Sequence, residues 1–386
     1  MTPFSPPSAP AEPVELGHPL SAWTLPHAGS LVPDGSGCLV FTDGAARDYH
    51  LIRLADPRCL GQRVRLTITF RPAPGGDAQL HVDHWGEITV CRIGRDGQVL
   101  ARGISESIEV THRPDGFLVA SVTYFSSTEV VALGSAQARS FYAGEGRAQF
   151  IFADIRIEAL DAAVPDAADR LVLVEYGQRA ALAHHWRALG PAIRPVLIQP
   201  DPEPIGRLRQ DVRGYPDSLV IHAALGEVDG PRVLHITRNR AWSSLLLPDA
   251  ARLARFSAAP GYALVTQAEV PGRRLAAMVA EGSVPAPDVL RVDARGAERA
   301  VLAGAGTLPA GCLGVEADTW LSPAYAGQSL LGDLVALLEA QGLDLVKVQP
   351  LGGFDAVLVA CRAFFLARDA QPGAKLALLR RAWLLG

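Results

Sequence analysis

The sequence is poor in cysteine, lacks any block of like charge, and contains no long apolar run. Its five cysteines are widely spaced and form no CxxC pair, so we interpret them as free, buried thiols rather than a disulfide framework or a zinc site. The 36 basic and 40 acidic residues are interspersed and leave a net charge of −4, which argues against nucleic acid or an anionic membrane as a partner. Because no stretch of about eighteen uninterrupted apolar residues occurs, we expect no membrane span.

The N-terminal segment MTPFSPPSAPAEPVELG is rich in proline. It lacks the basic start and the apolar core of a signal peptide. We therefore interpret residues 1–19 as a flexible tail and expect a cytoplasmic protein. With 386 residues, of which 49% are hydrophobic, the chain is long enough for two domains, each with its own core.

Residues 20–160 show the two-residue period of β-strands. In RVRLTITFRP (63–72), Val64, Leu66, Ile68 and Phe70 fall on one face. GEITVCRIGRDGQVLARG and SIEVTHRPDGFLVASVTYF each consist of a strand pattern, an Asp-Gly turn and a second strand pattern. Because no helical segment separates these strands, they predict an antiparallel β-sandwich, jelly-roll-like in type.

A different pattern follows the linker-like segment DAAVPDAADR (161–170). From residue 171 to 386, short apolar runs alternate with helical segments. The predicted strands begin with LVLVE (171–175) and continue at 196–200, 218–225, 288–294 and 312–318; the predicted helices include 251–257, 273–282, 297–306 and 330–342. Buried strands that alternate with helices predict an α/β domain with a parallel sheet covered on both faces.

Polar and small residues follow each predicted strand. In open α/β sheets, ligands bind beyond the carboxyl ends of the strands. The residues at this edge are Glu175, Gly177, Gln178, Gln199, Asp201, Ala223, Ala224, Asp293, Glu316 and Asp318. Strand ends are often polar for structural reasons alone, so the pattern by itself leaves both interpretations open.

Three ordered blocks resemble the FkbM family of S-adenosylmethionine-dependent methyltransferases. PDVLRVDARGAERAVLAGAG (287–306) is similar to the family's signature block, Asp-Leu-Leu-Lys-Ile-Asp-Val-Gln-Gly-Ala-Glu. ALGEVDGPRVLHITRNRAWSSLL (224–246) and EADTWLSPAYAGQSLLGDLVALLEAQGLDL (316–345) resemble the blocks on either side of it. The order of the three blocks, within a region of roughly 215 residues that begins at residue 171, is more specific than any one of them.

The resemblance implies a Rossmann-like methyltransferase domain that uses S-adenosylmethionine as methyl donor. The cofactor-binding residues that it implies are Glu175, Gly177, Gln178, Gln199, Asp201, Ala223 and Ala224. Asp293 is expected to lie nearest the transferred methyl group, and Glu298 is either a second catalytic carboxylate or a charge at a helix N-terminus. The candidate substrate residues are Ser243, Ser244, Glu316, Asp318 and Tyr325.

The first cofactor motif departs from the family pattern Asp-x-Gly-x-Asn-x-Gly. The chain has Glu175 and Gly177 in place, but Arg179 replaces the Asn and Ala181 the last Gly, so a cation approaches a cationic cofactor. Gln199 stands where Glu is usual, and loss of that charged hydrogen bond to the ribose costs roughly 1 to 3 kcal/mol. In the signature block, Arg295 stands where Gln is usual.

Two functions remain open on this basis. The first is an O-methyltransferase that acts on a hydroxyl of a glycan or a related metabolite. The second is a protein with the methyltransferase fold that no longer binds the cofactor and acts as a glycan-binding or scaffold protein. A dinucleotide-dependent oxidoreductase is discounted, because the first turn lacks the GxGxxG pattern.

The N-terminal domain resembles, in two stretches, a β-sandwich domain of phage-tail and carbohydrate-associated proteins. The stretches are PDGFLVASVTY (114–124) and FYAGEGRAQFIFADIRIE (141–158). Trp85, Tyr124 and Tyr142 are candidate platforms for stacking on sugars, although each is also a common type of half-buried sheet residue. The domain is expected to present the acceptor, to form a homo-oligomer, or to dock to a glycosylation assembly.

Overall fold

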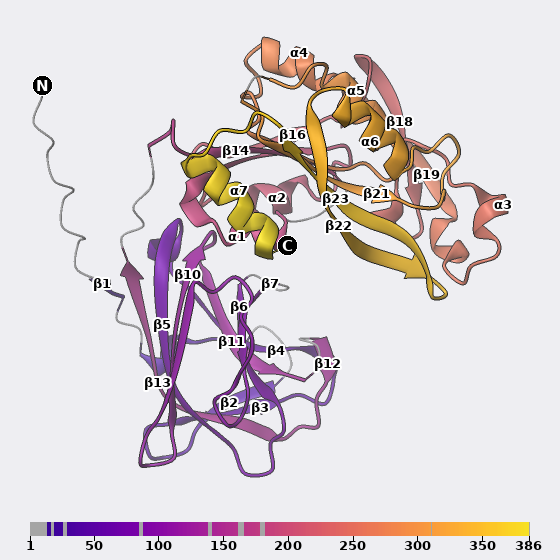
Figure 1. Ribbon diagram of the computed structural model, residues 1–386. Coiled ribbons are helices and arrows are strands. Elements are labelled where there is room, and N and C mark those ends of the chain that lie inside the picture. Colours follow the sequence, from indigo (N-terminus) through magenta and orange to yellow (C-terminus); the bar gives the residue numbers. More distant parts are fainter. Residues whose placement is uncertain are drawn as a thin grey trace, which may run out of the picture. The chain divides into compact units, whose positions relative to one another are not determined.

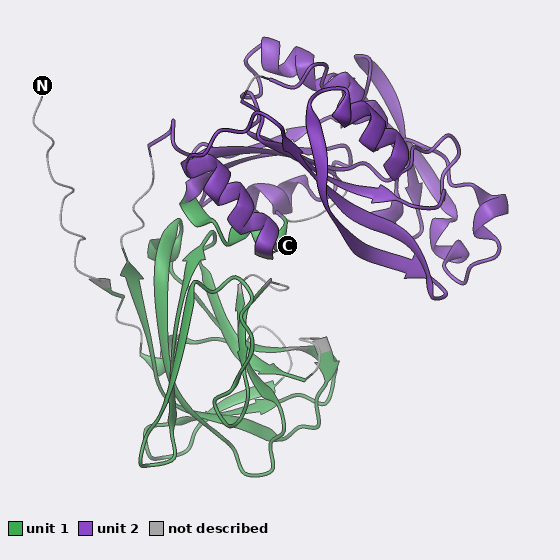
Figure 2. Cartoon of the chain, in the orientation of Figure 1, with its two compact units in different colours: residues 1–164, 183–191, 386 green, residues 165–182, 192–385 purple. Residues whose placement is uncertain are grey.

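The computed structural model describes residues 14–16, 19–25, 29–84, 88–137, 141–160, 166–177, 182–309 and 311–385. The chain divides into two compact units (Figure 2). The first comprises residues 1–164, 183–191 and 386, and the second comprises 165–182 and 192–385. The predicted linker at 161–170 spans the boundary. The segment 183–191 groups with the first unit, where Gly190 lies against the ring of Phe125.

The first unit consists of two antiparallel sheets (Figure 1). One has the order β2 (Gly29–Pro33), β3 (Leu39–Asp43), β13 (Ala148–Leu160), β5 (Gln62–Pro72), β10 (Leu118–Ser126), β9 (Ser107–His112), and β1 (Val14–Glu15) pairs with β13. The other has the order β12 (Phe141–Ala143), β4 (Arg47–Ala55), β11 (Val130–Ala136), β6 (Gln79–His84), β7 (Ile88–Ile93), β8 (Val99–Ala101). The predicted β-sandwich is confirmed.

The alternating pattern determines which face of each strand is buried. The side chains of Val64, Leu66, Ile68 and Phe70 on β5 are fully buried in the core between the sheets. Both predicted hairpins, β7–β8 and β9–β10, are present. Their turns place Gly97 at φ 83° and Gly116 at φ 82°, a backbone region that favours glycine.

The second unit contains a seven-stranded mixed sheet. Its order is β16 (Leu219–His222), β15 (Ile193–Gln199), β14 (Leu171–Gly177), β20 (Val289–Asp293), β21 (Gly314–Trp320), β23 (Val357–Ala367), β22 (Leu343–Phe354). The first five strands are parallel, and β23 runs antiparallel to both of its neighbours. The parallel sheet expected from the sequence accounts for the first five strands, and the antiparallel hairpin β22–β23 was not expected.

Helices cover both faces of this sheet (Figure 1). Residues of α4 (Leu275–Ala280), α5 (Glu298–Gly304) and α6 (Leu331–Glu339) share one core with Phe365 of β23. The neighbouring Phe364 points to the opposite face and packs edge-on against Trp383 of α7 (Ala374–Leu385), with ring centroids 5.2 Å apart. Helix α2 (Ile205–Asp211) follows β15 along the chain.

Three further elements differ from the predicted pattern. A small sheet, β17 (Ala224–Leu225), β19 (Leu264–Arg273), β18 (Gly230–Thr237), interrupts the alternation. The helix expected after the first turn is α1 (His184–Arg187), of only four residues, and α3 spans Ala250–Leu253.

The five cysteines are free, as predicted, and all except Cys38 are buried. Among the residues that the structure describes, no helix is long and apolar enough to cross a membrane.

Candidate functional site

The order of the sheet reverses between β14 and β20. From β14 the chain proceeds outward to β15 and β16, and it then returns to the other side of β14 at β20. Ligands of open α/β sheets bind at such a switch point. Gly177 and Asp293 are in register there. A Cβ at Gly177 would lie 2.9 Å from the Cβ of Asp293, so the glycine is required by the aspartate beside it. Gln178, Arg179 and Ala181, which follow Gly177, lie outside the described residues.

A buried arginine joins three of the predicted site residues. The guanidinium of Arg291, which is fully buried, donates to Oε1 of Glu175 and to Oε1 of Glu316, both at 2.8 Å, and to Oδ2 of Asp318 at 2.9 Å. Glu175, Arg291 and Glu316 lie side by side on β14, β20 and β21. Burial by itself would lower the pKa of Arg291, but the three carboxylates outweigh it and raise that pKa well above its ordinary value.

A second arginine completes this network. Arg362 on β23 donates from Nε to Oδ1 of Asp318 at 2.6 Å and forms an ion pair with Glu316 at 3.3 Å. Glu316 and Asp318 thus each contact both arginines, whereas Glu175 contacts Arg291. On Glu175, Oε2 is buried and has no hydrogen-bond partner among the described residues. This oxygen can still accept a hydrogen bond.

The loop after β20 carries the remaining titratable groups. Nε of Arg295 lies 3.2 Å from Oδ1 of Asp293. Glu298, the first residue of α5, is fully buried, and its Oε1 accepts a hydrogen bond from the N–H of Gly296 at 2.9 Å. Burial raises the pKa of Glu298 to about 8, which favours the protonated form of this carboxyl. Its hydrogen bond holds the loop that presents Asp293 and Arg295.

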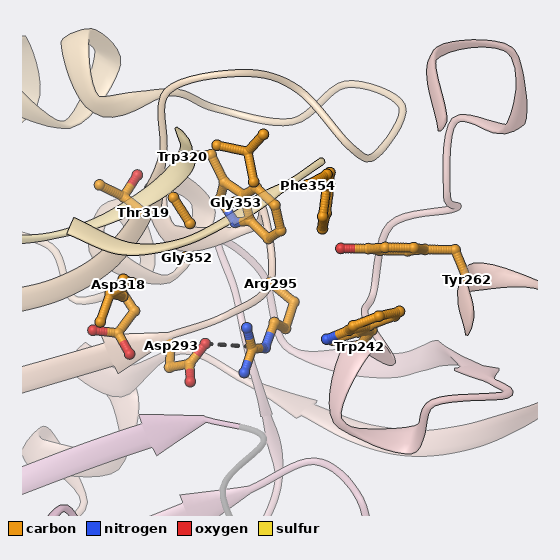
Figure 3. A pocket seen from close by; sticks show the side chains of 13 residues that line it. Trp242, Tyr262, Asp293, Arg295, Asp318, Thr319, Trp320, Gly352, Gly353 and Phe354 are labelled. Carbon is orange, nitrogen blue, oxygen red and sulfur yellow. Dashed lines mark ion pairs between the residues drawn. The ribbon is translucent and has the colours of Figure 1, made fainter. Parts of the chain in front are cut away.

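Asp293 and Asp318 line the same cavity (Figure 3). Its volume is about 310 Å³. Arg295 and Thr319 add polar groups, and the β22–β23 hairpin forms one side. Four aromatic side chains complete the lining: Trp242, Tyr262, Trp320 and Phe354. Two residues predicted for different roles, one catalytic and one in substrate binding, thus meet at one site.

The aromatic side of the cavity is built from two short 3-10 helices. Trp242 ends η4 (Arg240–Trp242) and Tyr262 ends η5 (Ala259–Tyr262); their rings stack with centroids 4.6 Å apart and an interplanar angle of 19°. A Cβ at Gly261 would overlap the Trp242 ring, so this stack requires glycine. Tyr325 lies behind it, buried, and its hydroxyl donates to the carbonyl oxygen of Trp242 at 2.8 Å.

Ser243 and Ser244 hold backbone rather than line the cavity. Oγ of Ser243 accepts from the N–H of Thr237 at 3.2 Å, and Oγ of Ser244 donates to the carbonyl oxygen of Arg295 at 2.8 Å. Sequence reasoning selected these serines but missed Trp242, the residue directly before them. Trp242 and Tyr262 lie outside the periodic segments of the sequence. The signal that could have identified Trp242 is the presence of an aromatic residue within a polar, turn-rich segment.

The carboxyl end of β15 is largely used by contacts within the chain. Oε1 of Gln199 accepts from the N–H of Asp201 at 3.0 Å. Arg240 binds both carboxylate oxygens of Asp201, from Nε at 2.6 Å and from NH2 at 2.8 Å. Ala223 donates its N–H to the carbonyl oxygen of Gln199, and Ala224 begins β17; both are buried.

The candidate sugar-stacking residues of the first unit are buried where the structure describes them. Tyr124 is fully buried in the core of the sandwich. Tyr142 is 7% exposed, and its hydroxyl is hydrogen-bonded to Ser135 and Asp43. Neither ring presents a face to solvent, and Trp85 lies outside the described residues.

The similarity of this chain to known proteins is found among solved structures. Neither the protein-family models nor the curated proteins match the chain. Among solved structures, a carbohydrate-binding module that recognises mannan, TmCBM27, is similar with 15% identity and a TM-score of 0.22, over 39% of this chain and 96% of that chain. The CBM22-1–GH10 modules of a Clostridium thermocellum xylanase, complexed with xylohexaose, are similar with 11% identity and a TM-score of 0.22, over 49% of this chain and 37% of that chain.

Proposed function

We propose that the protein is an S-adenosylmethionine-dependent O-methyltransferase that acts on a hydroxyl group of a glycan or a related metabolite. The observation that carries the proposal is the meeting of Asp293 and Asp318 in an aromatic-lined cavity beside the switch point of the sheet. Carboxylates accept hydrogen bonds and protons from hydroxyl groups. Aromatic rings supply the apolar surface on which the C–H face of a sugar ring can pack.

The order of the strands supports a nucleotide-type cofactor. Numbered along the chain within this sheet, the strands run 3-2-1-4-5-7-6. The part 3-2-1-4-5 is the order of doubly wound sheets, which bind nucleotides where the order reverses. This agrees with the Rossmann-like domain that the resemblance to the FkbM family implies.

The residues at the end of β14 fit the cofactor better than those at the end of β15. Glu175 keeps one buried carboxylate oxygen without a partner among the described residues, and this oxygen fits an ammonium group. Asp201 gives both of its oxygens to Arg240, so it offers less to a ribose, and Gln199 is the remaining candidate there. When bound, S-adenosylmethionine supplies a methyl group on a cationic sulfur.

Asp293 is the residue that we assign to proton transfer. It ends β20 at the switch point and lines the cavity with its carboxylate. A hydroxyl that reaches Asp293 can give up its proton to this carboxylate as it reacts. Trp242 and Tyr262 orient the acceptor (Figure 3). Phe354, whose ring packs edge-on against Tyr262, and Trp320 exclude water.

Calorimetry with S-adenosylmethionine tests the proposal directly. We expect binding to the natural protein, and we expect Asp293→Asn to bind the cofactor while it transfers methyl groups to a panel of methyl glycosides about 10²- to 10⁴-fold more slowly. Glu269→Gln, at an exposed position away from the cavity, is the control and should change neither. If millimolar S-adenosylmethionine gives no heat of binding and does not raise the melting temperature, the proposal is wrong.

A non-catalytic role for the same fold, as a glycan-binding or scaffold protein, is favoured by one observation. The carboxylate of Asp201 is expected to accept hydrogen bonds from the ribose hydroxyls of the cofactor. Both of its oxygens are instead bound by Arg240. If the natural protein binds no cofactor but Arg240→Ala together with Gln199→Glu creates binding, the non-catalytic role is supported. Equal cofactor binding by the natural protein and this variant would refute it.

A further inference from the structure

The loop that carries Arg295 is held in a strained conformation. Arg295 has a φ of 51°, a left-handed conformation that is unfavourable for residues other than glycine. Three hydrogen bonds fix the loop: Ser244 Oγ donates to the carbonyl oxygen of Arg295, Glu298 accepts from the N–H of Gly296, and Ser329 Oγ donates to the carbonyl oxygen of Gly296. Strain that the surroundings maintain in this way is a common feature of functional sites.

The guanidinium of Arg295 is turned into the cavity and only partly used. It lies between Asp293 and Trp242 (Figure 3). Its Nε is buried and faces Asp293 at 3.2 Å, but it has no hydrogen-bond partner among the described residues. Arg291, by contrast, uses all three of its nitrogens in hydrogen bonds of 2.8 to 2.9 Å. Arg295 therefore retains donors for a ligand, in the planar arrangement that matches a carboxylate.

The other carboxyl groups around Arg295 have arginine partners of their own or a raised pKa. Asp318, which also lines the cavity, is held by Arg291 and Arg362. Burial raises the pKa of Glu298 to about 8, which favours its neutral form. Asp293 is thus the partner of Arg295 that can be exchanged: the carboxylate of an anionic ligand would take its place beside the guanidinium.

The size and lining of the cavity restrict the ligand further. Its volume of about 310 Å³ is at the lower end of the range for ligand sites, which is about 300 to 1,000 Å³. A single ring with its substituents fills such a space. The ring of Phe354 and the stacked pair Trp242–Tyr262 supply apolar surfaces for it.

We propose that the acceptor is a sugar acid or a similar ring-sized hydroxy acid, and that Arg295 determines this specificity. The carboxylate of the acceptor pairs with Arg295, and a neighbouring hydroxyl then reaches Oδ1 of Asp293, which the guanidinium otherwise faces. Neutral sugars leave the pair between Arg295 and Asp293 in place. The inference rests on the proposed function for the reaction of the hydroxyl, but binding of the acid can be measured without the cofactor.

Calorimetry at pH 7, without S-adenosylmethionine, tests the inference with three pairs of ligands. Each pair is a methyl uronide and its neutral methyl glycoside, in the gluco, galacto and manno series. We expect at least one acid to bind tenfold or more tightly than its neutral partner, since one charged hydrogen bond contributes about ten- to a hundredfold. Absence of binding by all three acids, or equal affinity for acid and neutral sugar in every pair, overturns the inference.

Variants assign the preference to Arg295. Arg295→Gln, which restores the residue usual in the family, should abolish the preference, and Arg295→Lys should keep part of it. Arg299→Gln is the matched control: it lies on the neighbouring helix, its side chain is 54% exposed, and its nearest carboxylate, on Glu227, is 3.9 Å away. If Arg295→Gln keeps the full preference, the inference is wrong. If that variant fails to fold, Arg295→Lys decides the question: a reduced preference for the acid assigns the role to Arg295, and an undiminished preference rejects it.

Methyl transfer separates this inference from the proposed function. A preference for acids that depends on Arg295, without any methyl transfer, supports the acidic ligand and rejects the methyltransferase. Methyl transfer to neutral glycosides that is as fast as transfer to the uronides supports the methyltransferase and rejects the acidic acceptor.

Discussion

Replacing Arg291 by methionine is expected to destabilise the second unit strongly. The substitution removes three charge-assisted hydrogen bonds from a fully buried side chain. Asp318 keeps its bonds from Arg362, and Glu316 keeps an ion pair with Arg362 at 3.3 Å. Glu175 loses the one hydrogen bond that the described residues give its side chain, although it is only 5% exposed.

The magnitude follows from the charge that remains. Methionine has a similar length and stays apolar, so the main loss is electrostatic rather than a cavity. Removing one partner of a buried ion pair costs about 3 to 5 kcal/mol, because the other charge stays buried. Glu175→Gln removes that remaining charge. The double variant should therefore be more stable than Arg291→Met alone, with a coupling energy of about 1 to 3 kcal/mol.

Urea unfolding followed by tryptophan fluorescence measures both quantities. Trp242, Trp320 and Trp383 belong to the second unit, and the transition that they report is the one to compare. Arg252→Met, which removes an exposed pair with Asp249, is the control and should cost less than about 1 kcal/mol. A cost below about 1 kcal/mol for Arg291→Met, or no recovery with Glu175→Gln, would refute the reasoning.

Three further substitutions test other parts of the site. Burial raises the pKa of Glu298 from 4.5 to about 8, so the stability that this group contributes is present in full below about pH 4.5 and is lost as the pH rises through 8. Glu298→Gln should remove that dependence, which denaturant unfolding at pH 5, 6.5 and 8 measures. If the unfolding free energy of the variant changes with pH as steeply as that of the natural protein, the reasoning is wrong. Gly261→Ala should displace the Trp242 ring and weaken acceptor binding in calorimetry, with a Tm near that of the natural protein; unchanged affinity would contradict the role of this ring. Gly177→Ala brings a Cβ to 2.9 Å from that of Asp293 and should cost about 1 to 3 kcal/mol of unfolding free energy, whereas Gly332→Ala, where nothing lies within 4 Å, should not destabilise the protein.

The sequence predicted the strands of the first unit more completely than those of the second. In the first unit, the two-residue period specifies which side chains of β5 enter the core, and the Asp-Gly turns specify the hairpins β7–β8 and β9–β10. In the second unit, an apolar run predicts a buried strand but does not specify whether the strand is parallel or antiparallel to its neighbours. The reversal of β23 and the insertion of β18 and β19 depend on pairing between distant segments, which periodicity does not describe.

The positions of the site were partly predictable, but the partners of its side chains were not. Glu175, Asp293 and Asp318 were selected because the carboxyl ends of parallel strands lie at one edge of a sheet. Their pairing with Arg291 or Arg295 depends on lateral register and on the turn after β20. For the same reason Asp201 was selected as a cofactor residue, although Arg240, from a distant segment, binds both of its oxygens.

The acidic residues at this edge of the sheet differ in how their charge is compensated, and this difference indicates where the chemistry is expected. Glu316 and Asp318 are held by arginines that are themselves buried in strands, so a change of partner would disturb the sheet. For Glu298, burial raises the pKa to about 8 and favours the neutral carboxyl. Asp293 is paired with Arg295, whose side chain lines the cavity from a loop of strained backbone. A ligand that binds Arg295 would therefore leave the arginines buried in the strands in place, as the proposed role of Asp293 in proton transfer requires.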